Sequence, residues 1–116
     1  MTDINEDALL GEFAERAAAW DSIVGTDSKK ANRIFDQVHA LAKKLRQTPA
    51  GRTGLLGLTA HEISGVRLLA ATECLAWSPE VAVPVLEAIE GSGGLHAVSA
   101  KYTLMSYRAG TLDLDW

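Results

Sequence analysis

The sequence contains a single cysteine, three prolines and no long uninterrupted run of apolar residues. One cysteine excludes an internal disulfide, and we expect Cys74 to be a reduced, buried thiol because the residues around it are apolar. The lack of a long apolar run, together with an acidic first segment, argues against a membrane span or an export signal and predicts a soluble, cytoplasmic chain. The scarcity of proline and the abundance of Ala and Leu favour an all-α protein.

The length of 116 residues is typical of one domain, so we expect residues 1–116 to share one core. Apolar residues recur at steps of three and four and predict helices over about 5–24, 29–47, 54–61, 64–77, 79–90 and 95–109. Residues 1–28 supply the first helix and a loop, residues 48–53 read as a loop because of their Pro and Gly, and a Gly-rich break precedes the last helix. These short connections predict six helices in three antiparallel pairs.

We expect residues 61–90 to lie at the centre of the fold, because the first helix of this segment is apolar around nearly its whole circumference. Pro79 suits the first position of the following helix, and Pro84 inside that helix predicts a kink or a late start. In the last helix, four large apolar side chains share one face: Leu95, Val98, Tyr102 and Met105.

The helix predicted from residue 29 has the clearest amphipathic pattern. Its apolar stripe consists of Ala31, Ile34, Phe35, Val38, Leu41, Ala42 and Leu45. Beside this stripe runs a polar row at helical spacing, made of Asn32, Asp36, His39, Lys43 and Arg46. We expect Asn32 to be a buried amide that bridges two helices.

Charge is distributed unevenly along the chain. Residues 28–52 carry seven bases and one acid, a net charge of +6, whereas the remainder carries −10, so that the whole chain is at −4. A solvated helix face explains such a basic segment, and a surface that steers a charged partner is the functional alternative.

Residues that carry chemistry are scattered, and the sequence predicts no enzyme, no cofactor and no metal site. His39, His61 and His96 lie on different predicted elements, and Gly65 stands where a zinc-protease motif beginning at His61 needs its second His. Apart from Arg67, no basic residue shares the helical face of Cys74, so an activated nucleophile is not expected. The Gly-rich break lacks the Lys and Ser/Thr of a phosphate-binding loop.

The segment from Val66 resembles a HEAT-type repeat, whose second helix opens with a Val-Arg pair followed by an Ala pair and a Leu, here Val66, Arg67, Ala70, Ala71 and Leu75. More closely, the chain resembles a family of short bacterial HEAT-like proteins classified as a domain of unknown function, over residues 29–112. The segments that carry this resemblance are KKANRIFDQV, LLGLTAHE, PEVAVPVLEAI and YRAGTL. The resemblance implies a right-handed α-α superhelix.

A helical repeat without a catalytic constellation indicates a protein-interaction module, and an antidote to a secreted toxin is one such role known among small bacterial helical-repeat proteins. We expect the binding surface around Asn32, Asp36, His39, Lys43, Arg46 and Arg67, although a structural role for Arg67 with a carbonyl or carboxylate partner is the simpler expectation. Trp116 either packs back on the core, which we favour, or meets a partner. The alternative function is binding of a nucleic-acid phosphate backbone through the basic segment, and an enzyme would require His61, Glu62 and Arg67 to converge in a cleft.

Overall fold

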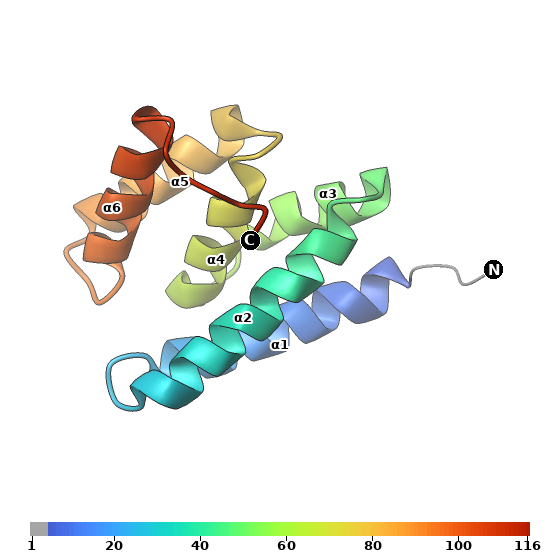
Figure 1. Ribbon diagram of the computed structural model, residues 1–116, viewed down its shortest axis with the longest axis horizontal. Helices are drawn as coiled ribbons and strands as arrows, with labels where there is room; N and C mark the ends of the chain where they lie inside the picture. Colours follow the sequence, from blue (N-terminus) through green and yellow to red (C-terminus); the bar gives the residue numbers. More distant parts are fainter. Residues whose placement is uncertain (1–4) are drawn as a thin grey trace.

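The computed structural model describes residues 5–116, which form six α-helices and no strand, as the sequence predicts (Figure 1). The helices are α1 (Glu6–Ile23), α2 (Ser28–Leu45), α3 (Pro49–Leu58), α4 (Ser64–Cys74), α5 (Pro79–Gly91) and α6 (Ala97–Arg108). Among the described residues, none of these helices combines the length and the apolar character that crossing a bilayer requires.

Helices α1 and α2 form a long antiparallel pair whose ends are set by side-chain caps (Figure 1). Asn5 accepts a hydrogen bond from the amide of Ala8 and begins α1, and Asp27 accepts from the amide of Lys30 and begins α2. Gly25 lies between them with a φ of 98°, a conformation that favours glycine. The apolar stripe predicted on α2 is confirmed, because five of its residues are buried and Ile34 and Phe35 pack against the core.

Helix α4 lies at the centre of the molecule and packs against α1, α3 and α5, with a smaller contact to α2. Most of its residues are buried, including Val66, Ala70 and Cys74, which have no exposed surface. The prediction of a helix covered on several sides is therefore confirmed. Burying its apolar side chains stabilises the fold by roughly 1.5–3 kcal/mol for each large one.

The predicted loop at residues 48–53 is wrong, because α3 already begins at Pro49. Thr48 caps the helix by accepting from the amide of Gly51, and Pro49 occupies the first turn, where its missing N–H leaves no bond unmade. Gly51 is needed for close packing, since a Cβ there would clash with the carbonyl oxygen of Leu45. The glycine and proline content therefore marks a helix start and a close approach.

The last two helices also differ from expectation. Helix α5 begins at Pro79, so Pro84 lies within the helix and does not delay its start. Helix α6 buries Ala100 and Leu104, whereas all four large residues of the predicted apolar face are exposed: Leu95, Val98, Tyr102 and Met105. The larger apolar face of α6 thus points away from the core.

Asp21 of α1 connects the first helix to the start of α4 and to the start of α6. Its Oδ1 accepts from the amide of Gly65 at 3.0 Å and lies 2.6 Å from Nε2 of His96. The ring of His96 also stacks on Trp20, with ring centroids 5.1 Å apart. A Cβ at position 65 would clash with this carboxylate, so the contact depends on glycine.

We predict that Gly65→Ala lowers the free energy of unfolding by about 1–3 kcal/mol, because the new methyl group displaces Asp21 from both partners. Gly57→Ala is the matched control: Gly57 lies in α3, and a Cβ there would have no atom within 4 Å. We expect this control to raise stability by about 0.5–1 kcal/mol. Urea unfolding followed by circular dichroism measures both. Equal effects of the two substitutions would show that Asp21 is not constrained by this contact.

Candidate functional site

The C-terminal tail, Thr111–Trp116, crosses the molecule as an extended segment and ends beside the middle of α2 (Figure 1). Gly110, with a φ of 73°, ends α6 and turns the chain back. The tail passes over α4, and Leu112 and Leu114 pack against the core. Four residues at α2 contact the tail, and Glu73 of α4 pairs with one of them. We name this surface the tail seat: Phe35, His39, Lys43, Arg46 and Glu73.

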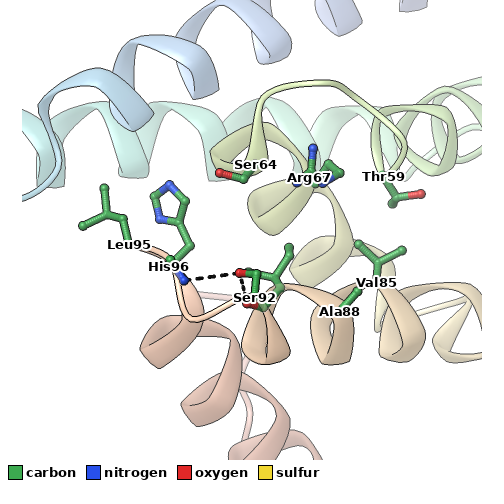
Figure 2. A pocket seen from close by; sticks show the side chains of 10 residues that line it. Thr59, Ser64, Arg67, Val85, Ala88, Ser92, Leu95 and His96 are labelled. Atoms are coloured by element: carbon green, nitrogen blue, oxygen red, sulfur yellow. Dashed lines mark hydrogen bonds between the residues drawn. The ribbon is translucent and has the colours of Figure 1, made fainter.

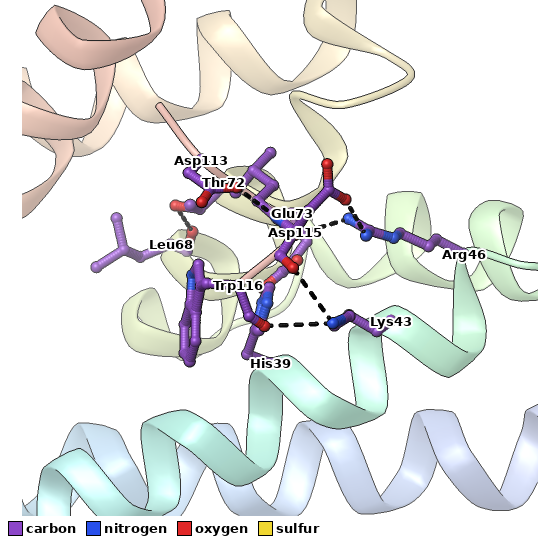
Figure 3. Close-up of polar contacts among 10 residues, drawn as sticks. His39, Lys43, Arg46, Leu68, Thr72, Glu73, Asp113, Asp115 and Trp116 are labelled. Carbon is purple, nitrogen blue, oxygen red and sulfur yellow. Dashed lines mark hydrogen bonds and ion pairs between the residues drawn. The ribbon is translucent and has the colours of Figure 1, made fainter. Parts of the chain in front are cut away.

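Two cations at the C-terminal end of α2 hold the tail in place (Figure 3). Arg46 donates to the backbone carbonyl of Leu114 at 2.9 Å and forms an ion pair with the carboxylate of Asp115. Lys43 donates to the backbone oxygens of Asp115 and Trp116 at 3.4 and 3.2 Å. Three of these contacts reach the backbone of the tail and fit an extended chain, whereas the ion pair with Asp115 depends on an acidic side chain.

Trp116 supplies the apolar end of the same contact. Its ring stacks on His39, with ring centroids 3.9 Å apart and planes at 13°, and on Phe35 at 5.7 Å and 10°. Each such aromatic pair contributes about 0.5–1.5 kcal/mol beyond simple burial. Trp116 nevertheless remains 49% exposed. The prediction that it packs back on the core holds only in part, because Trp116 stacks on two side chains of α2 while about half of its surface stays exposed.

Beneath this stack lies a buried acid–imidazole pair. Nδ1 of His39 lies 2.8 Å from Oε2 of Glu73, and both side chains are almost fully buried (Figure 3). Burial raises the pKa of the Glu73 carboxyl above its ordinary value of 4.5, against the opposing effects of the His39 hydrogen bond and of the positive charges of His39 and Arg46. Within residues 5–116, Nε2 of His39 and Oε1 of Glu73 have no hydrogen-bond partner.

We predict that stability depends on pH through Glu73. A carboxyl with a raised pKa binds more protons in the folded than in the unfolded chain, so its contribution to stability falls as the pH rises from about 4.5. Glu73→Gln keeps an acceptor for His39 and removes this titration. The free energy of unfolding of the variant, relative to that of the original chain, should therefore increase as the pH rises above about 4.5. Urea unfolding across this range measures the difference, and a difference that is constant with pH would contradict the assignment.

An apolar hollow of about 250 Å³ lies beside the tail seat. Phe35 belongs to both, and Leu68 and Thr72 of α4 form part of the lining (Figure 3). Ser99 and Thr103 place α6 at its far wall. The tail seat thus continues into an open apolar surface between α2 and α6, with its cations at the opposite end.

Three of the six binding residues expected from the sequence come together in the tail seat, namely His39, Lys43 and Arg46. His39 is buried at 3% exposure, although the sequence places it in a polar row. Asn32 and Asp36 are not buried and take no part. The expectation of a buried, bridging Asn32 is wrong, because its side chain is exposed on the surface of α2.

Arg67 lies apart from the tail seat. It lines a pocket of about 220 Å³ between α4, α5 and the loop before α6, together with His96 and Ser92 (Figure 2). Its guanidinium donates to the backbone carbonyls of His61 and Glu62 at 2.7 and 3.0 Å. The side chains of His61 and Glu62 do not line this pocket, and Arg67 has the carbonyl partners that the simpler expectation assigned to it.

The basic segment holds two groups of bases at the two ends of α2 and one base, Arg52, in α3. Lys29, Lys30 and Arg33 are exposed near the N-terminal end of α2. At its C-terminal end, Lys43 and Arg46 are partly buried and bound to the tail, and Lys44 is exposed beside them. At 1.5 Å per helical residue, the two groups are separated by roughly 20 Å.

Cys74 is buried in α4, and burial raises the pKa of its thiol to about 12, with the nearby Glu73 carboxylate as a second cause. A thiol in this state is neither a nucleophile nor a metal ligand at neutral pH. The described part of the chain also holds no group of three or more His, Cys, Asp or Glu placed to bind a metal ion.

We predict that Cys74 in the folded protein does not react with an aromatic disulfide reagent at a pH of about 8, because its thiol is protonated and covered. One thiol per chain should react after unfolding in guanidinium. Absorbance of the released thiolate measures both states. Rapid reaction of the folded chain would show that α4 is accessible to the reagent.

Sequence reasoning missed Glu73, Phe35 and Asp115 as parts of the site. The alternation of apolar and acidic residues in the tail is visible in the sequence, and so is the cluster of bases at the end of α2. Their complementary charges are the one signal that relates segments about 70 residues apart.

Comparison with known proteins gives two matches. The model of the family described as "Domain of unknown function (DUF2019)" matches residues 8–107, which include nearly all of α1 and end before the tail. The crystal structure of the protein RPA1889 from Rhodopseudomonas palustris CGA009 is similar, with a TM-score of 0.85 and 29% sequence identity over 97% of this chain and 98% of that chain. Comparison with curated proteins gave no match.

Proposed function

Since the chain belongs to the DUF2019 family, whose description names no activity, we propose from its geometry that it is a non-catalytic protein-interaction module. The observation that carries this proposal is the tail seat, where α2 and its C-terminal cap Arg46 hold an extended peptide through two cations and an aromatic stack. A surface that binds the chain's own backbone in this way has the chemistry to bind a segment of another protein.

The shape of the site supports the same function. The tail seat is flanked by an apolar hollow that reaches α6, so a longer segment can continue beyond the position of Trp116. Aromatic and arginine side chains of the kind found here are typical of the residues that contribute most to protein–protein binding. We propose His39, Lys43 and Arg46 as binding residues and leave Arg67 a structural role.

For the fold we propose a right-handed, HEAT-like α-α superhelix. The pairs α1–α2, α3–α4 and α5–α6 each pack together, and α4 packs on α5, as a stack of repeats requires. In this arrangement α2, α4 and α6 would line the inner face that repeat proteins use for binding. A bacterial, cytoplasmic interaction protein, including an antidote to a toxin, is consistent with this proposal, and its partner would be another protein.

The alternative function is nucleic-acid binding, and one observation favours it. Lys29, Lys30 and Arg33 are exposed on the first turns of α2 and make no ion pair within residues 5–116. Against it, the chain outside residues 28–52 carries a net charge of −10, whereas nucleic-acid-binding domains are usually basic overall.

The test is a pull-down from native lysate with tagged protein, with and without nuclease. We predict that Lys43→Glu with Arg46→Glu lowers capture of the protein partner at least about tenfold, because removing a hydrogen-bonded charge from a binding site costs about 2–5 kcal/mol. The matched control, Lys29→Glu with Lys30→Glu, changes the net charge by the same amount on exposed residues of the same helix. This control variant should capture the protein partner as well as the original chain does.

The opposite pattern would overturn the proposal. If the control variant failed to capture the material, and nuclease removed it from the original protein, the exposed end of α2 would be a phosphate-binding surface. Quantifying bound protein and bound nucleic acid in the same samples separates these results.

A further inference from the structure

Building on the protein-interaction function above, we propose which partner the tail seat accepts. The partner presents an extended segment in which acidic and apolar residues alternate and a large aromatic side chain stacks on His39. The tail of this chain, with the sequence TLDLDW, is then an internal competitor that the partner segment displaces.

The chemistry of the partner follows from the present occupant of the seat. Arg46 binds one carboxylate and one backbone carbonyl of the tail, so the seat favours an acidic residue next to an extended backbone. Phe35 and His39 offer a nearly parallel pair of ring contacts to a single aromatic side chain. A segment with both features matches all of these contacts at once, whereas an acidic segment without an aromatic residue leaves the stack unused.

The tail is bound in a way that permits displacement. The carboxylate-bearing side chain of Asp115 is 84% exposed, and half of Trp116 faces solvent. The tail adds no strand to a sheet and no turn to a helix, so its removal breaks no secondary structure. It also leaves Nε2 of His39 and Oε1 of Glu73 without partners within residues 5–116, and a partner side chain with an amide or hydroxyl group could bind them.

Any partner must bind the tail seat more strongly than the tethered tail does. A short flexible tether holds its end at an effective concentration on the order of millimolar, so a free peptide with the same contacts competes poorly with the intact tail. Opening the seat by changing the tail should therefore strengthen binding of such a peptide.

The experiment uses the full chain and a fluorescein-labelled peptide with the sequence of residues 111–116. In the opened variant, Asp115→Lys with Trp116→Ala, the tail is repelled by Arg46 and Lys43 and no longer stacks on His39. Fluorescence anisotropy should show that this variant binds the peptide at least about tenfold more tightly than the original chain, as relief from a tethered competitor requires. Circular dichroism melts confirm that the variant is folded.

Three controls each remove one of the contacts that are proposed to hold the peptide. A peptide with Trp→Ala, a peptide with both Asp→Asn, and the opened variant carrying Arg46→Glu should each abolish most of the binding. A single-stranded oligothymidylate is the second probe.

Absence of peptide binding to the opened variant, or equal binding to the two chains, would overturn this proposal. If the opened variant preferred the oligothymidylate, the partner would instead be a single-stranded nucleic acid whose bases stack on His39. The pull-down described above tests separately whether this face binds proteins. If only the peptide assay fails, the partner chemistry is wrong; if the pull-down also fails, the proposed function is wrong.

Discussion

The burial of α4 is the constraint on which the rest of the structure depends. A helix that is apolar on nearly all sides must be covered by several neighbours, and α1, α3 and α5 provide that cover, with α2 alongside. Covering α4 also buries its one carboxylate, Glu73, which then requires a polar partner. His39 provides it from α2, and the aromatic surface created by this pairing receives Trp116. The tail seat is thus a consequence of how the core is packed.

Much of the architecture could be predicted because it follows from local periodicity and capping. The stripe on α2 and the start of α5 at Pro79 are both properties of a few neighbouring residues. The failures have equally local causes. The residues around Pro49 are equally typical of a loop and of a helix start. Only the close approach of Gly51 to Leu45 in the folded chain distinguishes the two. In α6 the large side chains suggest a core face, yet the buried side of the helix carries the small Ala100, which permits close packing.

The candidate site was less predictable than the fold because its parts come from distant segments. Helical spacing on α2 identified His39, Lys43 and Arg46 but could not show that His39 is buried while Asn32 is exposed, since these residues lie on neighbouring parts of one helix face. From the sequence, Arg67 is expected on the same surface because it is the charged residue of an apolar helix, but carbonyl groups in the turn before α4 hold its guanidinium elsewhere. The tail and α2 come together only in the folded chain, so no pattern within either segment predicts their contact.

The tail gives the molecule a connection that a linear stack of helices lacks. Its hydrogen bonds with α2 join residues 68 to 73 positions apart, whereas most helix contacts in the fold are between neighbours in sequence. Forming them closes a longer loop, and therefore costs more chain entropy, than forming contacts between neighbouring helices. The exposed Asp115 and the half-exposed Trp116 are features of segments that open at a lower free-energy cost than the core. Release of the tail would therefore separate it from α2, whereas the contact of Asp21 with His96 would still join α1 to the start of α6.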